Sequence, residues 1–455
     1  MPSTAEHPLR VRALAALLDQ RSKGAFSREY RLITGSQWFS PSRVQELQFE
    51  RLRALLRHAE SSVPFYTRSF AEHGIRAESI SSPADFTRIP PLTKALAVAH
   101  SAELLSTVGR PGLLTKKATG GSTGERMVFY RDADAMSRNF AHVLRNYTWT
   151  GLHLGETHAF LWGAHFDLRA QQRLSNRIIN YCLRQQWLDA FRMNERTMAD
   201  YVEDLRRWRP RLLSAYVTAA ATLSDFAIER GLAPIGVPAI ATTAESLFPA
   251  HRKRLETGFG ATVFDRFGCR EIGNTAQECE DHSGLHVNAE HVYLEIVDDR
   301  DQPVAAGREG DVLYTSLGNW RFPLIRYRVG DRAVAASADA CRCGRGLPKI
   351  AGVRGRETDM LVTPNGTRVH GEYFSHLFYG LASVLEFRVL QESTTAIRIW
   401  VRLAGGRAAL PAGDEASLRS AFAGLFGPAT DLEIAVVDEI PKTASGKRRF
   451  TESRI

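Results

Sequence analysis

Residues 119–126 read Thr119-Gly120-Gly121-Ser122-Thr123-Gly124-Glu125-Arg126, and this polar stretch lies between two apolar segments. The flanking segments, Leu113–Leu114 and Met127–Tyr130, are predicted to be short strands. Glycine lets backbone N–H groups approach a ligand and hydroxyl groups add donors, so such a loop can wrap an anion. The Gly-Lys-Ser or Gly-Lys-Thr of the usual phosphate loop does not occur in it. The residues alone therefore leave two interpretations open, a phosphate-binding loop of another design and a flexible hairpin connection.

The size and charge of the chain exclude several classes of protein. Its 455 residues predict more than one domain at roughly 150 residues each. No apolar run approaches the ~20 residues that span a bilayer, and residues 1–7 lack the pattern of a secretory signal. The net charge of +9 favours anionic ligands in general, but no basic run interleaved with aromatic residues indicates nucleic acid. We therefore expect neither a membrane nor a nucleic acid as partner.

The cysteines are few and odd in number, which argues against a disulfide framework. They are Cys182, Cys269, Cys279, Cys341 and Cys343. Reduced thiols are usual in the cytoplasm, so a cytoplasmic location is predicted.

Helical patterns come first and are followed by alternating strands and helices. Residues 1–100 are predicted to be a helical lead-in, in which Leu52, Leu55, Leu56 and Ala59 share one helix face. From residue 119 to about 270, the alternation predicts a mostly parallel sheet covered by helices. Ligands of such sheets bind beyond the carboxyl ends of strands. The predicted strands are 159–163, 212–216, 238–242 and 262–264, and the predicted helices are 197–207, 220–230 and 248–258.

The pattern changes after about residue 286. Segments 292–297 and 311–315 alternate as antiparallel strands do, so residues 286–356 are predicted to form an antiparallel or barrel-like subdomain. Residues 357–455 restart as a small α+β domain, with strands at 360–362, 387–390, 397–401 and 432–437 and helices at 372–378 and 415–426. The predicted fold class is therefore α/β. It has a large N-terminal domain, residues 1–356, with mixed, mostly parallel, helix-covered sheets and the antiparallel subdomain, followed by the small domain.

Four short motifs that could carry chemistry occur in order along the chain. They are Phe267-Gly268-Cys269-Arg270-Glu271, Tyr327-Arg328-Val329-Gly330-Asp331, Gly355-Arg356 and Pro441-Lys442-Thr443-Ala444-Ser445-Gly446-Lys447. Singly they are weak, because a lone carboxylate after a strand is more often a turn or cap residue. Together they resemble the adenylate-forming superfamily of acyl-CoA ligases and adenylation domains, most nearly the phenylacetate-CoA ligase branch with the related capsule-biosynthesis proteins. Segments 55–59, 63–66 and 89–94 look like the same branch, so the resemblance covers nearly the whole chain.

The resemblance implies a nucleotide site. Residues 119–124 would hold the β- and γ-phosphates of ATP. The family commonly has lysine after the last glycine of this loop. Glu125 stands there in this chain, and Arg126 is expected to supply the charge. Glu271 matches the glutamate that helps to place Mg²⁺, and Asp331 matches the aspartate that accepts hydrogen bonds from the ribose hydroxyls. The other residues that the resemblance places near the nucleotide are Glu245, Arg266, Phe267, Gly268, Arg328 and Arg356.

The resemblance also implies a mobile C-terminal domain. Lys447 matches the lysine that bridges the reacting carboxylate and the α-phosphate, and a lysine on a glycine-containing loop suits arrival by domain closure. The family's hinge follows the arginine of Gly355-Arg356, and here either Thr358 or Asp359 could serve.

A pocket for the acyl group is expected beside the nucleotide. Its predicted lining is Trp162, Gly163, His165, Phe166, Ala244 and Cys269, together with Glu245, Phe267 and Gly268. His165 either contacts a polar substrate or is a structural histidine.

A second group of residues has the composition of a zinc site. Cys279 with His282, and Cys341 with Cys343, could close a tetrahedral set of ligands, with His286 as an alternative histidine. The resemblance supports zinc, since related ligases include members with zinc in this region. The alternative is a set of unliganded thiols with His286 packed against Tyr293.

These expectations describe an ATP- and Mg²⁺-dependent enzyme. A carboxylate is a poor electrophile, and adenylation by ATP, which depends on positioning and electrostatics, supplies a good leaving group. The expected substrate is a small, aromatic carboxylic acid, and the default acceptor is coenzyme A. One alternative is an enzyme of specialised metabolism with an amine acceptor or an unusual acid such as nitrite. Others are a non-catalytic nucleotide- or acyl-binding protein on a ligase fold and a zinc-organised interaction protein.

Overall fold

The computed structural model describes residues 9–109, 114–118, 127–162, 174–190, 193–356, 360–366, 368–370, 374, 377–378, 381, 383–440 and 450–455. The chain divides into two compact units, unit 1 (Met1–Val353) and unit 2 (Arg354–Ile455). The boundary lies inside strand β14 (Lys349–Arg356), whereas the sequence pattern predicted it after Arg356.

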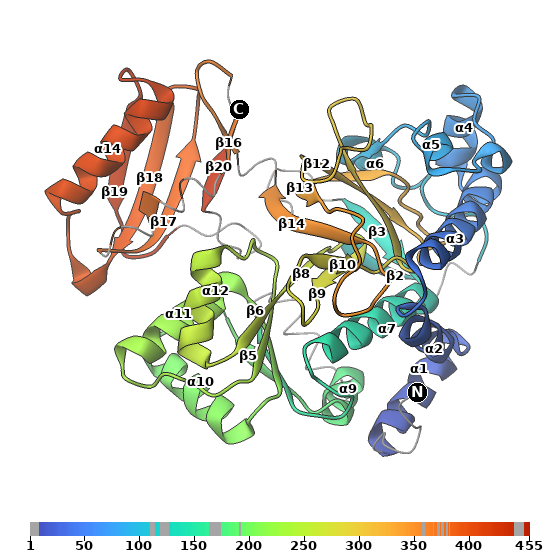
Figure 1. Ribbon diagram of the computed structural model, residues 1–455, viewed down its shortest axis with the longest axis horizontal. Coiled ribbons are helices and arrows are strands. Elements are labelled where there is room, and N and C mark those ends of the chain that lie inside the picture. The colour runs from blue at the N-terminus through green and yellow to red at the C-terminus, as the bar shows by residue number, and fades with distance from the viewer. Residues whose placement is uncertain are drawn as a thin grey trace. The chain divides into compact units, whose positions relative to one another are not determined.

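Unit 1 begins with a group of helices, shown in blue in Figure 1. They are α1 (Leu9–Ser22), α2 (Ala25–Ser36), α3 (Pro41–Ser62), α4 (Pro64–Glu72), η1 (Ala77–Ser79), α5 (Pro83–Phe86) and α6 (Lys94–Ala99). Helix α3 begins where the Ser40 hydroxyl accepts a hydrogen bond from the Arg43 amide, which satisfies one of the amides that a helix start leaves unpaired. Its apolar face is buried, as the spacing predicts.

Five parallel strands follow in unit 1, with helices between them. The strands are β4 (His158–Trp162), β5 (Gln185–Asp189), β6 (Leu212–Tyr216), β7 (Ala239–Thr243) and β8 (Thr262–Cys269). Helix α7 (Ala133–Trp149) precedes β4. The helices between the strands are α9 (Leu174–Cys182), α10 (Glu195–Trp208), α11 (Val217–Glu229) and α12 (Pro249–Phe259).

Successive residues of these strands point to opposite faces of the sheet. Leu213, Ile240 and Val263 share a core with α10, α11 and α12, while Leu212 and Phe264 share another with α2 and α7. Helices therefore cover both faces, as the predicted alternation requires.

The antiparallel strands continue the same sheet. They are β9 (Gly273–Glu278), β10 (Leu285–Val287), β11 (Val292–Val297), β12 (Glu309–Ser316), β13 (Tyr327–Ala335) and β14, and the short strand β1 (Leu92–Thr93) pairs with β13. The strand order is β11-β12-β13-β14-β10-β9-β8-β7-β6-β4-β5, a twelve-stranded sheet with β1. The α/β class is confirmed, but the predicted antiparallel subdomain is joined by backbone pairing to the parallel half. Strand β8 makes the junction, because it pairs parallel to β7 and antiparallel to β9.

A two-stranded ribbon flanks residues 119–126, which lie outside the described residues. Strand β2 (Thr115–Ala118) pairs antiparallel with β3 (Val128–Arg131). The second predicted strand is present, while the first begins one residue later than the predicted pair Leu113–Leu114.

Unit 2 is a small α+β domain. Its elements are β15 (Met360–Val362), β16 (Arg368–His370), β17 (Val384–Gln391), β18 (Ala396–Leu403), η4 (Ala404–Gly406), α14 (Ala412–Phe426), β19 (Asp431–Val436) and β20 (Thr451–Ser453). The sheet has the order β19-β18-β17-β20, and α14 packs its buried phenylalanines, Phe422 and Phe426, into the core of this unit. The predicted helix at 372–378 falls largely outside the described residues.

Within the part of the chain that the structure describes, no helix is both long enough and apolar enough to cross a membrane.

Candidate functional site

Glu271 lies in the turn between β8 and β9 of unit 1. Its side chain is buried. The turn is tight, because a Cβ on Gly268 would lie 2.2 Å from the carbonyl oxygen of Gly273. Glycine is therefore needed at position 268 for the backbones of β8 and β9 to approach each other. Cys269, also buried, ends β8 immediately before this turn.

Asp331 lies in β13 and is buried beside an aromatic pair. The Tyr314 hydroxyl, from β12, donates a hydrogen bond of 3.1 Å to Asp331 Oδ2. The Tyr314 ring lies 6.0 Å from that of Phe267 in β8. The sheet thus brings together Asp331 and Phe267, both expected near the nucleotide. Tyr314 was not among the predicted residues, because in the sequence it is only one member of an alternating strand.

Two arginines expected near the nucleotide have other partners in unit 1. Arg328 forms ion pairs with Asp301 and Asp311. Arg266 lies over the ring of Tyr147, 6.0 Å from its centre, and donates to its hydroxyl at 3.3 Å. The guanidinium of Arg328 is thus engaged by two carboxylates, and its expected place near the nucleotide stays a prediction. Arg356 ends β14, and its side chain is outside the description.

Glu245, also expected near the nucleotide or substrate, caps a helix. Its carboxylate accepts hydrogen bonds from the Thr218 amide, at 2.7 Å, and the Thr218 hydroxyl, at 2.9 Å. Thr218 lies in the first turn of α11, where a carboxylate is stabilised by the free amides and the helix dipole. Ala244 precedes it with a φ of 72°, a left-handed conformation that is uncommon for alanine. Strand β7 thus ends in a bend that directs Glu245 to α11.

Aromatic side chains gather where β4 and β6 end. Trp162, the last residue of β4, has its ring centre 4.6 Å from that of Tyr216, the last residue of β6. Phe160 stacks on Trp187 of β5 at 4.2 Å. Trp162 was predicted to line the acyl pocket, and the structure surrounds it with rings that the sequence did not single out.

The glycine-rich stretch from Thr119 to Arg126, the pocket residues Gly163, His165 and Phe166, the hinge candidates Thr358 and Asp359, and Lys447 lie outside the described residues.

Four side chains of the kinds that bind metal ions converge near the C-terminal end of β9, the end away from Glu271. One ligand atom each from Cys279, His286, Cys341 and Cys343 lies within 4.8 Å of the others. Cys279 and Cys341 have sulfurs 3.7 Å apart, and His286 Nε2 lies 3.2 Å from Cys343 Sγ. Such a group of thiols and an imidazole can hold a metal ion.

His286 is oriented for ligation by its second ring nitrogen. Its Nδ1 lies 3.1 Å from the carbonyl oxygen of Leu347. A carbonyl only accepts, so Nδ1 carries the proton and Nε2 presents its lone pair to the group, as in many metal-bound histidines. Burial lowers the pKa of His286 to about 4, which keeps the ring neutral at physiological pH.

The histidine of the group differs from the first choice of the sequence pattern. His282 lies beside the Glu278 carboxylate, with 3.2 Å between Nδ1 and Oε2, and its ring packs on Phe264. The group contains His286 instead, because β10 lies between β9 and β14 and directs this side chain toward the cysteines. His286 also packs against Trp149, not against Tyr293. The sequence spacing alone could not distinguish the two histidines.

Comparison with known proteins identifies relatives over most of the chain. A family model described as the CapK C-terminal domain matches residues 361–454. Phenylacetate-coenzyme A ligase of Thermus thermophilus is 28% identical over 334 residues, which cover 70% of this chain and 72% of that protein. Protein CapK of Staphylococcus aureus is 23% identical over 415 residues, covering 90% and 89%. The fold is similar to that of 2-hydroxyisobutyryl-CoA ligase in complex with R3-HIB-AMP, with a TM-score of 0.72 at 19% identity over 90% of both chains.

Proposed function

We propose that this chain, which belongs to the adenylate-forming superfamily in the branch of phenylacetate-CoA ligases and CapK, activates a small carboxylic acid with ATP. A carboxylate oxygen attacks the α-phosphorus, and the bond to the β-phosphate oxygen breaks, giving an acyl-adenylate and pyrophosphate. In the second step the thiol of coenzyme A attacks the acyl carbonyl, loses its proton and displaces AMP. The observation that carries the proposal is the sequence relationship to phenylacetate-CoA ligases over 70% of the chain.

Two buried carboxylates of unit 1 have the chemistry for the nucleotide. Asp331, held by the Tyr314 hydroxyl, would accept hydrogen bonds from the ribose hydroxyls. Glu271 offers the kind of oxygen ligand that Mg²⁺ prefers, and the bound ion would neutralise phosphate charge. The glycine-rich stretch from Thr119 to Arg126 and Lys447 would complete the phosphate contacts.

The aromatic character of the acid is supported by side chains in unit 1. Trp162 and Tyr216 lie at the ends of β4 and β6 with ring centres 4.6 Å apart, and a ligand bound beyond these strand ends would meet their rings. Aromatic rings gain from offset or edge contacts with other rings. An aromatic acid would therefore bind more tightly than an aliphatic acid of the same size.

Zinc is the ion that best fits the group of Cys279, His286, Cys341 and Cys343. Three thiolates and one neutral imidazole are a common structural zinc set, whereas Mg²⁺ and Ca²⁺ prefer oxygen ligands. The group joins the turn after β9 to the segment between β13 and β14. Its role is therefore structural, stabilising the antiparallel half of the sheet.

The acceptor in the second step has a specific alternative. The CapK match covers 90% of this chain, and a CapK model matches residues 361–454, most of unit 2. The name of that relative does not specify an acceptor, so an amine in place of coenzyme A stays the alternative of the sequence analysis, with the adenylation step unchanged.

Exchange of pyrophosphate into ATP tests the adenylation step. The assay would use a panel of aromatic and aliphatic acids, and product formation would be followed with coenzyme A, with amines and without acceptor. We expect exchange that depends on an aromatic acid and on Mg²⁺, and a fall by orders of magnitude in Lys447→Ala, since such a lysine stabilises charge in the transition state. Absence of exchange and of AMP with every acid would favour a non-catalytic binding protein. Near-normal exchange in Lys447→Ala would refute the role of that residue.

A further inference from the structure

The turn that carries Glu271 is held by side chains from other elements of unit 1. Arg131, the last residue of β3, donates from one guanidinium nitrogen to the carbonyl oxygens of Arg270 and Glu271, each at 3.0 Å. Arg131 is itself buried. Burying a cation costs free energy unless the cation forms hydrogen bonds or ion pairs. The two carbonyl oxygens of the turn provide such hydrogen bonds for Arg131.

Three more side chains hold the next residues of the turn. His291 Nε2 lies 3.1 Å from the carbonyl oxygen of Ile272. The Asn139 side chain accepts a hydrogen bond from the Asn274 amide at 3.1 Å, and Asn288 donates to the Asn274 carbonyl at 2.9 Å. The backbone from residue 270 to residue 274 is thus fixed from β3, from α7 and from the segment between β10 and β11.

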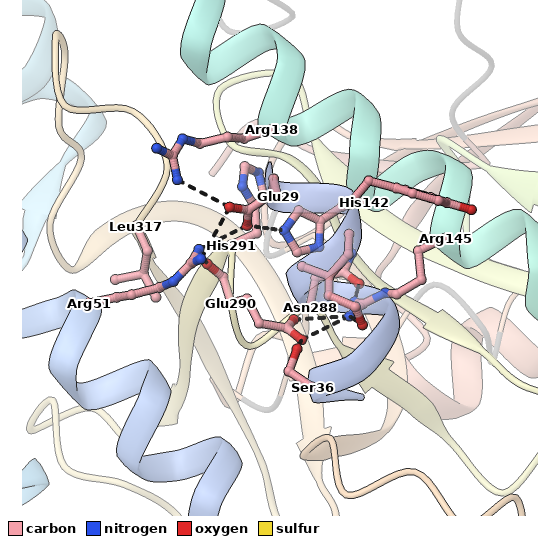
Figure 2. Close-up of polar contacts among 12 residues, drawn as sticks. Glu29, Ser36, Arg51, Arg138, His142, Arg145, Asn288, Glu290, His291 and Leu317 are labelled. Carbon is pink, nitrogen blue, oxygen red and sulfur yellow. Dashed lines mark hydrogen bonds and ion pairs between the residues drawn. The ribbon is translucent and has the colours of Figure 1, made fainter. Parts of the chain in front are cut away.

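A buried polar network behind the turn holds two of these side chains, Asn288 and His291. Figure 2 shows Glu290, between Asn288 and His291, beside Arg145 and Ser36. The same view shows a second carboxylate surrounded by the side chains of three residues. It is Glu29, and its partners are Arg51, Arg138 and His142. Arg145 also donates to the Asn288 side chain, and the His142 ring packs on that of His291 with centres 5.0 Å apart. These contacts hold the segment from Asn288 to His291 in the position from which it contacts the turn.

The geometry points to Arg131 as a positioning residue for Glu271: its two hydrogen bonds, with those of Asn139 and His291, hold the Glu271 carboxylate where it receives the Mg²⁺ of the nucleotide. This inference rests on the proposed function. Arg131 also ends β3, the strand that follows residues 119–126. One side chain therefore joins the strand leaving the proposed phosphate loop to the turn bearing the proposed Mg²⁺ ligand.

The planar guanidinium suits this position, because one terminal nitrogen carries two hydrogens in a fixed plane. A single Arg131 nitrogen faces two successive carbonyl oxygens, and the planar group has a fixed orientation. Lysine would retain the charge but would lose that orientation. Groups that orient a metal ligand typically change metal affinity or activity about 10- to 100-fold when replaced.

The test compares Arg131→Lys with a matched control, Arg326→Lys. Arg326 is also a buried arginine, and it donates to two carbonyl oxygens, those of Thr87 and Ile89, at 2.8 and 2.6 Å. Nucleotide affinity would be measured by calorimetry with Mg²⁺ and with EDTA, and thermal unfolding would be recorded for each variant. We expect Arg131→Lys to weaken ATP binding about 10- to 100-fold with Mg²⁺ and to leave binding in EDTA unchanged. Arg326→Lys should lower the melting temperature alone.

Asn139→Ala is the second variant, for the case that Arg131→Lys does not fold. It removes the acceptor for the Asn274 amide and should weaken Mg²⁺-dependent binding in the same direction by a smaller factor. Unchanged Mg²⁺-dependent binding in a folded Arg131→Lys, or in Asn139→Ala where Arg131→Lys does not fold, would overturn the inference. A wild-type protein that does not bind Mg²⁺-ATP would instead refute the proposed function, so the two failures are distinguishable.

Discussion

Two buried polar clusters of unit 1 balance their charges in different ways. In the first, the carboxylates of Glu29 and Glu290 face cations supplied by the chain, Arg51 and Arg138 for Glu29 and Arg145 for Glu290. In the second, the cluster of Cys279, His286, Cys341 and Cys343 brings together only ligand atoms that a cation would bind. The first cluster is balanced by the chain's own charges, whereas the second has the ligand set of the proposed zinc site.

The pKa values follow from this difference. Burial opposes the charge on Glu29, but the contacts with His142 and Arg51 outweigh it and hold the pKa well below its usual value. Arg145 acts in the same way on Glu290, against the effect of burial. Burial lowers the pKa of His286, and the positive charges of Arg345 and Lys349 act in the same direction. The carboxylate cluster thus remains charged in the interior, while His286 stays neutral.

Removal of the metal should have the largest effect. The free energy of zinc binding to structural sites is on the order of 10 kcal/mol and is available only to the folded chain. Chelation, or Cys343→Ser, should therefore lower the melting temperature more than any replacement below, and the purified protein should contain one zinc per chain by elemental analysis. Cys182→Ser is the control, since Cys182 packs with Leu14 and Leu183 away from the cluster. Less than about half an equivalent of zinc without chelators would refute the site.

Glu290→Gln should lower the free energy of unfolding by less than removal of the metal does, but still by a large fraction of the total. It leaves Arg145, which is fully buried, without its opposite charge, and breaking a buried pair in this way typically costs about 3–5 kcal/mol. Urea unfolding measures the change. The control is Glu203→Gln, because Glu203 is 72% exposed in its pair with Arg207 and such pairs are worth less than about 1 kcal/mol. Equal effects in the two variants would show that the buried cluster is no more stabilising than a surface pair.

The smallest effect should appear as a dependence on pH. Burial, with His142 and Arg131 nearby, lowers the pKa of His291 to about 3, far below the ~6.5 of an unfolded chain. The unfolded chain therefore takes up a proton as the pH falls through 6.5, the folded chain does not, and stability declines with falling pH. The slope of unfolding free energy against pH, measured between pH 7 and pH 5, should be smaller in His291→Gln. The decrease should correspond to the uptake of up to one proton fewer on unfolding. An unchanged slope would mean that His291 is protonated in the folded chain.

Much of the fold could be predicted from local patterns. The apolar face of α3, the alternation of β4 to β8 with helices, and the strands of unit 2 agree with the predicted segments. These features depend on spacing along the chain, which periodicity reports directly. The joining of both halves into one sheet was not predicted, because pairing of β8 with β9 and of β10 with β14 depends on contacts between segments far apart in sequence.

The candidate site was predictable to a smaller extent. The ordered motifs identified Glu271 and Asp331 as candidates, but Arg328 and Glu245 proved to be engaged by other groups of the protein. Motif matching assigns a residue type to a position and carries no information on which neighbours compete for the side chain. Tyr314 could not be found in this way, since its hydrogen bond to Asp331 joins two strands.

The sequence by itself predicted the resemblance to the adenylate-forming superfamily, the α/β class and a group of candidate cysteine and histidine ligands, because motif order, periodicity and composition are properties of the chain. Only the tertiary structure decided that His286, and not His282, joins Cys279, Cys341 and Cys343. It also decided that Arg131 holds the turn of Glu271. The physical reason is the same in both cases, since such contacts are set by which strands lie side by side and by which face each side chain takes.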